Sequence, residues 1–387
     1  MCARWWRRFG SLVATRFDAT RFRVVAVASD AGGANAVAPV IRALRVQEQV
    51  EVHALAHQSA ATVWKDWRLS CERLPRAIPT SLATARLRDV SLLLTGTSAA
   101  PIDCEKKFIA AARASGIPSL AVLDFWSNYA ERFSDARGRL IYLPDRIAVM
   151  DTDARDAMIA AGIPPDRLVV TGQPAFDELA DLRRRFTPTQ RRMIRINSRV
   201  PSNALLVLFV SQPLVRLFGT DATNPRYPGY DERSAFSAVV SALEEIAAQS
   251  ERDVVLIVRQ HPKERVGQWR QAQSEQIRID VLHEHSPRQV MLAADLVVGM
   301  TSTLLVEACL LGCVTVSLQP NLRTPDKFPL SRWGVGCSIY RADEIKPALE
   351  KLLLDDATRA TVLARSPKLK LDGQATQRVI ELTGRMS

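Results

Sequence analysis

The hydrophobic positions of this chain form short unbroken runs, separated by stretches in which apolar residues recur at helical spacing. The run Arg23–Ala28 leads into a glycine-rich turn, Ser29–Asn35, which is followed by Val37, Val40 and Leu44 on one helical face. Unbroken apolar runs of this length are typical of strands that are buried on both faces of a parallel sheet. A strand, a glycine-rich turn and a helix in this order predict the opening of a nucleotide-type α/β domain.

The first half of the chain repeats this alternation. Further strands are predicted at Val50–Ala56, Ser91–Thr95, Ser119–Leu123, Arg146–Met150 and Arg167–Thr171. Helical patterns lie between most of them, notably at Lys106–Ser115 and Thr152–Ala161. The alternation predicts βαβ units and a largely parallel sheet.

A second series of the same kind fills the other half, without an internal repeat of sequence. Its strands are predicted at Ala204–Val210, Asp253–Arg259, Ile279–Leu282, Leu296–Gly299 and Val314–Leu318. Its helices are predicted around Ala235–Ala248, Pro287–Ala293, Leu304–Leu311 and Ala342–Leu354. The sequence therefore predicts two open α/β sheets, one after the other.

The stretch between the two series, from Asp177 to about Pro201, is charged and rich in arginine, which favours a linker. A chain of 387 residues is long for one core and suits two domains. We therefore predict an α/β protein with a Rossmann-like N-terminal domain at 23–185 and a Rossmann-like C-terminal domain at 200–387. Because open α/β sheets bind ligands beyond the carboxyl ends of their strands, we expect the informative residues to follow each strand and to line a central cleft.

Composition narrows the class of protein. Hydrophobic residues make up 47% and charged residues 24% of the chain, so it can bury large cores and is not disordered by composition. No apolar run reaches membrane-spanning length, and the N-terminus lacks the features of a secretory signal. The six cysteines form no Cys-x-x-Cys pair, which favours a reducing cytoplasm. Cys309 and Cys313 lack further zinc ligands nearby and are interpreted as packing residues.

The formal net charge of +11 raises the question of an anionic partner. Its positive residues are spread along the chain without a nucleic-acid-binding motif, so we predict anionic donors and an anionic membrane surface as partners, and no nucleic acid. Residues 1–22 form a basic aromatic leader, in which Arg4–Phe9 mixes arginine with tryptophan and phenylalanine. Two interpretations of the leader stay open, an interfacial membrane anchor and a disordered terminal segment.

The strongest chemical signal follows the predicted strand Asp253–Arg259. Arg259, His261 and Lys263 alternate there and can present cationic or donor groups to one anion. Pro262 fixes φ and ends the strand at the point where the chain has to turn. The alternative is a solvated charged loop.

A second signal lies at the end of the strand Leu296–Gly299. After Gly299, the hydroxyl residues Thr301, Ser302 and Thr303 open a helix, and hydroxyls together with backbone amides at a helix N-terminus can bind an anion. The alternative is simple capping by Thr301 or Ser302. Glu307, one turn further, is a candidate ligand for a ribose hydroxyl, or else a solvated helix carboxylate or a partner for a cap.

Two aspartates follow strands of the N-terminal domain. Asp30 lies in the glycine-rich turn, where Gly32 and Gly33 allow a ligand to approach the backbone. Its alternative is a turn-forming residue.

Asp124 follows the strand Ser119–Leu123 and precedes Trp126 and Tyr129. A carboxylate at a strand end suits a general base for an acceptor hydroxyl, and the aromatic side chains offer area for stacking on a sugar. The alternative for Asp124 is a helix cap.

Together, the His-Pro strand end and the Thr-Ser-Thr helix start resemble the motifs of bacterial GT-B glycosyltransferases: sialyltransferases, Kdo transferases and CDP-glycerol glycerophosphotransferases. The resemblance implies two facing Rossmann-like domains. It also implies that His261, Ser302 and Thr303 contact the donor phosphate and that Glu307 contacts the ribose.

The C-terminal half also resembles UDP-N-acetylglucosamine 2-epimerase, through Gln260–Glu264 and the segment Glu307–Gly312. Thr171–Asp177 matches the epimerase-type end of the first domain. The chain departs from that family at Gly96–Ser98 and Val122–Trp126, where acidic residues needed for epimerisation are not matched one for one. Epimerase chemistry is therefore the alternative and not the first prediction.

We predict a glycosyltransferase or glycerophosphotransferase that moves a sugar or sugar-like group from a nucleotide-activated donor to a surface-polysaccharide or lipopolysaccharide acceptor. The alternatives are a nucleotide-sugar epimerase or hydrolase and a non-catalytic binding protein. We expect a cytoplasmic protein, peripheral at the inner face of the cytoplasmic membrane if the leader is an anchor, with a glycan or lipid-linked acceptor. No cofactor and no metal are expected, because helix dipoles and basic side chains can neutralise the departing phosphate. His283 and His285 lack a third ligand and are interpreted as a surface loop.

Overall fold

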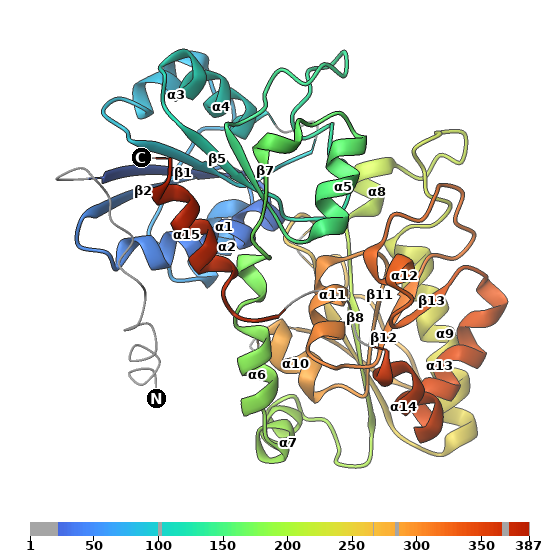
Figure 1. Ribbon diagram of the computed structural model, residues 1–387. Helices are drawn as coiled ribbons and strands as arrows, with labels where there is room; N and C mark the ends of the chain where they lie inside the picture. Colours follow the sequence, from blue (N-terminus) through green and yellow to red (C-terminus); the bar gives the residue numbers. More distant parts are fainter. Residues whose placement is uncertain (1–21, 100–102, 266, 283–285, 366–370, 387) are drawn as a thin grey trace. The chain divides into compact units, whose positions relative to one another are not determined.

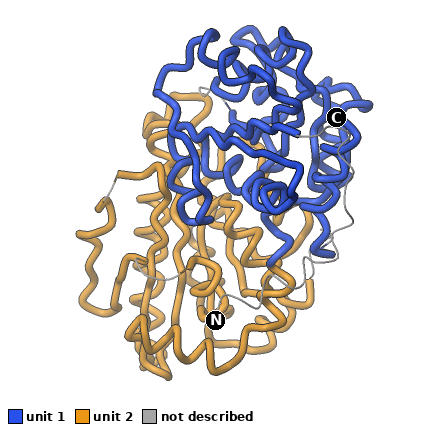
Figure 2. Tube along the Cα trace, turned by 90° about the vertical axis from the view of Figure 1, so that its left-hand side faces the viewer, with its two compact units in different colours: residues 1–178, 369–387 blue, residues 179–368 orange. Residues whose placement is uncertain are grey.

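The computed structural model describes residues 22–99, 103–265, 267–282, 286–365 and 371–386. The predicted leader and the loop with His283 and His285 lie outside these residues. The chain divides into two compact units, with residues 1–178 and 369–387 in unit 1 and residues 179–368 in unit 2 (Figure 2). Among the described residues, no helix is both long and apolar enough to cross a bilayer.

The described part of unit 1 holds one parallel sheet in the order β3-β2-β1-β4-β5-β6-β7 (Figure 1). Its strands are β1 Phe22–Ala28, β2 Val50–Ala56, β3 Glu72–Arg73, β4 Leu92–Thr95, β5 Ser119–Val122, β6 Arg146–Val149 and β7 Leu168–Val170. Its helices are α1 Ala31–Arg45, α2 Ala60–Asp66, α3 Thr80–Arg86, α4 Cys104–Ala114, α5 Thr152–Ala160 and α15 Ala375–Gly384. The crossover from β1 to β4 places the carboxyl ends of neighbouring strands at one edge, where the βα loops collect.

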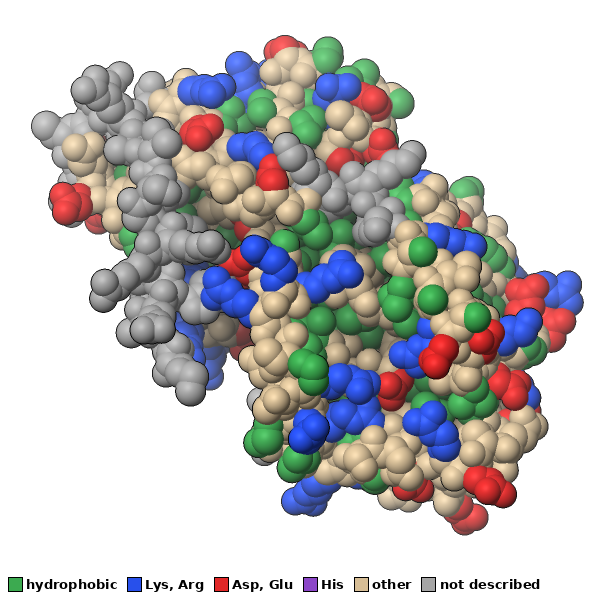
Figure 3. Space-filling view, turned by 60° about the horizontal axis from the view of Figure 1, so that its bottom comes forward, with side chains coloured by type: hydrophobic (Ala, Val, Ile, Leu, Met, Phe, Trp, Pro, Cys, Tyr) green, Lys and Arg blue, Asp and Glu red, His purple; other side chains and the backbone are tan. Residues whose placement is uncertain are grey.

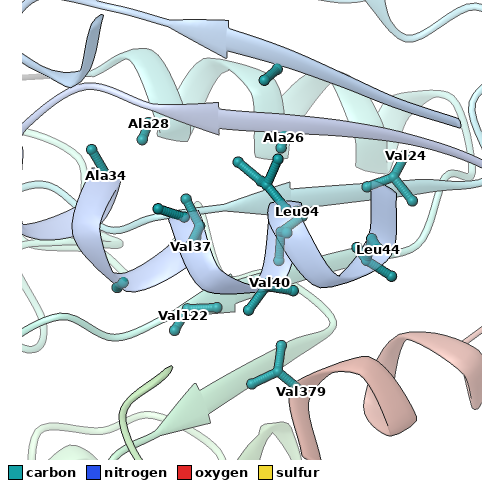
Figure 4. Close-up of a cluster of buried hydrophobic side chains, with 14 of the residues drawn as sticks. Val24, Ala26, Ala28, Ala34, Val37, Val40, Leu44, Leu94, Val122 and Val379 are labelled. Atoms are coloured by element: carbon teal, nitrogen blue, oxygen red, sulfur yellow. The ribbon is translucent and has the colours of Figure 1, made fainter. Parts of the chain in front are cut away.

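Both faces of this sheet are covered, which explains the unbroken apolar runs of its strands. Val24 of β1 packs with Val37 of α1 and Val379 of α15 on one face (Figure 4). The next residue, Val25, points to the opposite face and packs in a cluster with Phe108 of α4. The predicted α/β class with parallel sheets is confirmed.

The C-terminal helix returns to unit 1, whereas the sequence predicted residues 200–387 as one domain. Asp177 accepts hydrogen bonds from the backbone amides of Ala375 at 2.9 Å and Thr376 at 2.7 Å, which are the first amides of α15. Ile380 of α15 is fully buried in the core of unit 1. A helix that buries its apolar face on a distant sheet belongs to that sheet, wherever it lies in the sequence.

Unit 2 holds a second parallel sheet, in the order β10-β9-β8-β11-β12-β13 among its described residues. The strands are β8 Leu205–Val210, β9 Val254–Arg259, β10 Arg278–Val281, β11 Leu296–Gly299, β12 Thr315–Leu318 and β13 Cys337–Ile339. The helices are α6 Leu179–Arg185, α7 Pro188–Asn197, α8 Leu214–Phe218, α9 Glu232–Ser250, α10 Pro287–Ala293, α11 Thr303–Leu310, α12 Pro329–Trp333, α13 Ile345–Leu354 and α14 Asp356–Ala364. Its core joins β8, β9 and β11 to α9 and α13.

The stretch predicted as a linker, Asp177–Pro201, folds instead into α6 and α7, which belong to unit 2. A capping box opens α7, because Thr187 and Gln190 each satisfy a backbone amide of the other. Arg195 of α7 is buried and lies 3.3 Å from the Asp295 carboxylate. The arginines suggested a solvated linker, but at least Arg195 is buried and holds this segment against the rest of unit 2 through its ion pair with Asp295.

Candidate functional site

The His-Pro segment of unit 2 forms a tight turn just beyond β9. The amide of Glu264 donates to the carbonyl of His261 at 3.0 Å, and the Glu264 carboxylate accepts from the amide of His261 at 2.6 Å. The same carboxylate accepts from the hydroxyl of Ser211, at the end of β8, at 2.5 Å. Glu264 is buried and joins the ends of two neighbouring strands. The turn that presents His261 is therefore a fixed structure and not a solvated loop.

His261 is neutral in this setting. Burial, followed by the charges of Lys263, Arg259 and Arg216, lowers its pKa to about 4. The amide of Lys263 donates to His261 Nδ1 at 3.0 Å. A neutral imidazole whose Nδ1 accepts a hydrogen bond carries its proton on Nε2. His261 is thus a hydrogen-bond donor from Nε2, and the positive charge comes from its basic neighbours.

Three basic side chains surround this turn. Arg259 donates from Nη1 to the carbonyl of Gln260, and Arg216 of α8 donates to the carbonyl of Lys263 at 2.8 Å. Arg216 was not among the predicted site residues, because it lies on a short helix far from the motif in the sequence. Folding brings Arg216 close to His261, so that its charge helps to lower the pKa of the imidazole.

The second predicted motif opens α11. The hydroxyl of Ser302 caps the helix by accepting from the amide of Leu304 at 3.3 Å, as the capping alternative expects. The amide of Thr301 donates to the side chain of Gln212 at 2.7 Å, so a protein group already occupies it. Thr303 is the first residue of the helix and is partly exposed. The region around Ser302 and Thr303 is therefore what α11 offers to an anion.

Gly299 has a packing reason for its missing side chain. A Cβ at this position would lie 2.6 Å from the carbonyl oxygen of Val210, so β8 and β11 could not pair as closely. The glycine is explained without a ligand.

Glu307 forms a buried ion pair, which the sequence did not predict. Its carboxylate lies 2.6 Å from Nε of Arg288 on α10, and both side chains are largely buried. The alternative of a solvated helix carboxylate is therefore wrong. A ribose hydroxyl would have to share this carboxylate with Arg288.

Strand β8 brings the two motifs of unit 2 together. It lies between β9 and β11, so the His261 turn and the start of α11 lie two strand spacings apart, about 10 Å. Ser211 and Gln212, which follow β8, contact the two motifs on either side. Neither residue was predicted as a site residue. Their position directly after a buried strand could have suggested a role at the site. Two neutral residues, however, do not by themselves indicate a particular chemistry.

In unit 1, Asp30 caps α1. Its carboxylate accepts from the amide of Gly33 at 2.8 Å, so Asp30 is a helix cap, a role that the sequence did not predict for it. Gly33 and Gly96 lie against each other, because a Cβ on Gly96 would come within 2.7 Å of the Gly33 Cα. The glycines thus allow the loops after β1 and β4 to touch.

Asp124 lies beside these loops and is buried. Its Oδ1 accepts from the hydroxyl of Thr97 at 2.7 Å and from Nη1 of Arg132 at 2.5 Å. Its Oδ2 lies beside Gly32, where any Cβ would overlap this oxygen. Asp124 is therefore a carboxylate held on one oxygen, next to a position where only glycine fits. It forms no helix cap.

The predicted stacking role of Trp126 is wrong. The side chain is 1% exposed, donates from Nε1 to Asp151 at 2.6 Å and stacks against Phe176. A tryptophan whose ring is buried and whose Nε1 already donates to a carboxylate offers no area to a sugar. Tyr129 is partly exposed in the loop beyond it.

A buried carboxylate that the sequence analysis missed ties the unit 1 loops together. Glu105 of α4 accepts from the amide and the hydroxyl of Ser29 and from the hydroxyl of Ser98, at 2.7–2.8 Å. Burial raises the pKa of Glu105, and the hydrogen bonds from Ser29 and Ser98 oppose this shift. In the sequence Glu105 lies within a helical pattern, which does not indicate that its carboxylate contacts Ser29 after β1 and Ser98 after β4.

A metal site does not emerge from the described part of the chain, in which no three His, Cys, Asp or Glu side chains come together. Cys309 and Cys313 are instead thiols whose pKa burial raises, to about 11 and about 12. Independence from metal stays a prediction.

The fold defined by these two units is of the GT-B type, as the solved structures similar to this chain establish. A UDP-GlcNAc 2-epimerase from Neisseria meningitidis, bound to UDP-GlcNAc, has a TM-score of 0.67 at 15% identity, over 93% of this chain and 99% of that one. A Methanocaldococcus jannaschii UDP-GlcNAc 2-epimerase in complex with UDP-GlcNAc and UDP has a TM-score of 0.63 at 13% identity, over 93% and 99%.

A glycosyltransferase from Rickettsia africae is also similar, with a TM-score of 0.56 at 11% identity over 95% of this chain and 99% of that one. No family model matches the chain, and no curated protein matches it significantly. At these identities the likeness establishes the fold alone. The finer resemblance to sialyl-, Kdo- and CDP-glycerol-type transferases stays a prediction.

Proposed function

We propose that this protein acts on a nucleotide-activated sugar and transfers the sugar, or a sugar-like group, to an acceptor. The observation that carries the proposal is the His261 turn, in which a neutral imidazole donor lies among Arg216, Arg259 and Lys263. Such a turn suits a diphosphate, because the basic side chains supply charge while the imidazole supplies a directed hydrogen bond. The similar structures that hold UDP or UDP-GlcNAc support a nucleotide sugar as the ligand.

The donor's phosphates are proposed to lie between the His261 turn and the start of α11. Nε2 of His261 and the Ser302–Thr303 region would contact them, with Arg259 and Lys263 stabilising the charge that develops on the leaving nucleotide. Glu307 is proposed to reach the ribose with the oxygen that Arg288 does not occupy. No metal is required in this arrangement, so we expect a chelator to leave turnover unchanged.

The acceptor side is proposed to lie at the strand ends of unit 1. Asp124 is the candidate general base, because Arg132 and Thr97 hold one oxygen and orient the other beside Gly32. In the reaction, an acceptor hydroxyl gives its proton to Asp124 as its oxygen bonds the anomeric carbon. The bond from that carbon to the nucleotide phosphate breaks, and the phosphate keeps the electron pair.

A second candidate function is that of a nucleotide-sugar epimerase or hydrolase, favoured by the higher TM-scores of the epimerases. Against it, Thr97 stands in the segment where the epimerase family has an acidic residue, and its hydroxyl is spent on Asp124. Removing a proton from one face of a sugar and returning one to the other calls for two proton-transfer groups. At the described strand ends of unit 1, the Asp30 carboxylate caps a helix and the Glu105 carboxylate accepts hydrogen bonds from serines. Neither carboxylate therefore suits the role of a second proton-transfer group.

One experiment separates the functions. CMP, CDP, UDP, GDP and ADP are first screened by thermal shift, because a ligand of the folded state raises the melting temperature. The matching nucleotide sugar is then followed by NMR, alone and with glycan or lipid-linked acceptors. A transferase consumes the donor faster when an acceptor is present, whereas an epimerase or hydrolase converts it alone. Binding without turnover under either condition would contradict both enzymatic assignments.

Transfer to surface polysaccharide or lipopolysaccharide is the finer form of this proposal. It follows from the motif resemblance and needs acceptor tests of its own. A panel of capsule and lipopolysaccharide fragments tests it once the donor is known.

A further inference from the structure

The helices α6 and α7 carry an excess of positive charge that the proposed reaction does not use. Residues 179–199 include seven arginines and a single acidic residue, Asp181. Arg191 and Arg195 turn inward to Asp295, at 2.7 and 3.3 Å. The other five are exposed, although the Arg183 guanidinium lies against Gly312: Arg183, Arg184, Arg185, Arg192 and Arg199. Asp181 pairs with two of these and leaves the surface strongly basic.

Exposed apolar side chains lie on the same helices. Met193 and Ile196 are three residues apart on α7 and are 49% and 57% exposed; Ile196 is the most exposed large hydrophobic residue of the described chain. Leu182 of α6 and Phe186, directly after α6, line a groove of about 270 Å³ with Met193. Single exposed hydrophobic residues are ordinary on protein surfaces, but here two exposed ones on α7 lie with the half-buried Leu182 and Phe186 in one apolar area, which marks an interaction surface.

The chemistry of this surface, which we call the α6–α7 patch, selects one kind of partner. On the face of the molecule in Figure 3, Lys and Arg side chains lie beside exposed hydrophobic ones. The groove is smaller than the about 300–1,000 Å³ of a typical small-molecule site. Single-stranded nucleic acid would be bound through aromatic stacking as well as charge, and Phe186 is the one aromatic residue in residues 179–199. Aliphatic side chains among arginines instead fit the headgroup and acyl boundary of an anionic bilayer.

We propose that the α6–α7 patch docks the folded protein on an anionic lipid surface. The arginines lie at the level of the phosphates, while Met193 and Ile196 insert between acyl chains. The patch belongs to residues 179–199, a different segment of the sequence from the leader, residues 1–22, whose membrane attraction is a prediction of its own. The proposal does not depend on the transfer reaction, although a lipid-linked acceptor would be presented at such a surface.

The test uses two matched double variants of the full chain. Arg192→Glu/Ile196→Ser changes the patch, and Arg155→Glu/Ile159→Ser makes the same changes at the same spacing on α5 of unit 1. Ile159 is likewise exposed, at 39%. Both variants keep residues 1–22 unchanged, so any contribution of the leader is the same in each. Circular dichroism melting and nucleotide thermal shift verify that the fold and the nucleotide site are intact.

Co-sedimentation is measured with phosphatidylcholine vesicles, with and without phosphatidylglycerol. The wild-type chain is expected to bind the anionic vesicles and to lose binding as salt rises. The patch variant should bind them roughly tenfold more weakly or worse, since each basic residue near such a surface contributes about 1 kcal/mol. The α5 variant should stay within about twofold of wild type.

Three outcomes would overturn the proposal. The first is equal vesicle binding by the patch variant and wild type. The second is an equal loss in the α5 variant, which would mean that overall charge decides. The third is a loss of single-stranded RNA binding in the patch variant while vesicle binding persists, which would assign the surface to nucleic acid.

Discussion

Each unit has a parallel sheet with loops at the carboxyl ends of its strands, but the charged side chains at these ends have opposite sign in the two units. In unit 1, buried carboxylates hold the loops at the strand ends: Glu105 joins Ser29 to Ser98, and Asp124 joins Thr97 to Arg132. In unit 2, basic side chains collect around the neutral His261 at that edge. One sheet therefore presents an acidic edge and the other a basic one. The comparison teaches that the βα loops, and not the sheets, set the chemistry of each unit.

The largest expected effect is on the acidic edge. Asp124→Asn keeps an oxygen for Thr97 and Arg132 but removes the base, so turnover should fall roughly a hundredfold or more, with donor affinity close to wild type. Steady-state kinetics and calorimetry measure the two quantities. Asp30→Asn is the matched control, because asparagine caps a helix as well as aspartate does. If Asp124→Asn keeps its turnover while Asp30→Asn loses it, Asp30 is the base and the assignment is reversed.

An effect of similar size, on stability, is expected from the carboxylate that holds the unit 1 loops. Glu105→Ala leaves the buried amide and hydroxyl of Ser29 without their acceptor, which should lower the free energy of unfolding by about 3 kcal/mol. Glu105→Gln keeps an acceptor and should lose less. Urea denaturation of both variants checks the order. Equal stability of Glu105→Ala and wild type would show that this clamp contributes nothing.

On the basic edge, the expected losses concern nucleotide affinity. His261→Asn retains an oxygen that can accept from Lys263 in place of Nδ1, but it lacks the Nε2 donor, so nucleotide binding should weaken by about 1–2 kcal/mol with the turn intact. Ser302→Ala should weaken it to a similar extent. Calorimetric affinities are compared with those of Asp124→Asn, which should bind like wild type. Unchanged affinity in both unit 2 variants would remove the phosphate site from this edge.

The smallest effect on nucleotide affinity is expected from pH. Because the pKa of His261 is about 4, its ring stays neutral between pH 8 and pH 6, and affinity for a nucleotide sugar should not change there on its account. The unfolded chain takes up the proton near pH 6.5, before the folded one does, so stability is lost as the pH falls from about 6.5 to 4. His261→Asn should lack this loss. Affinity that rises on going from pH 8 to pH 6 in wild type only would indicate a charged His261.

Much of the fold follows from local patterns. The predicted strand Val50–Ala56 and the helix Pro287–Ala293 match the structure end to end, because buried strands and one-sided helices leave periodic signatures in a sequence. Short or edge elements such as β3 and β13 were missed, since two or three half-buried residues carry no period. The Arg-rich stretch was misinterpreted because inward ion pairs such as Arg195 with Asp295 have the same composition as a solvated linker.

The sequence by itself determined the two α/β sheets, the strand ends at which chemistry collects, and the presence of His261, Ser302 and Asp124 there. These features follow from the local pattern of hydrophobic residues and from the polar residues that come directly after buried strands. The tertiary structure decided which partners these residues have: Glu264 and the Lys263 amide for His261, Arg132 and Thr97 for Asp124, Arg288 for Glu307. It also returned α15 to unit 1 and buried Trp126. Burial and charge pairing arise between segments far apart in the chain, so no local pattern encodes them.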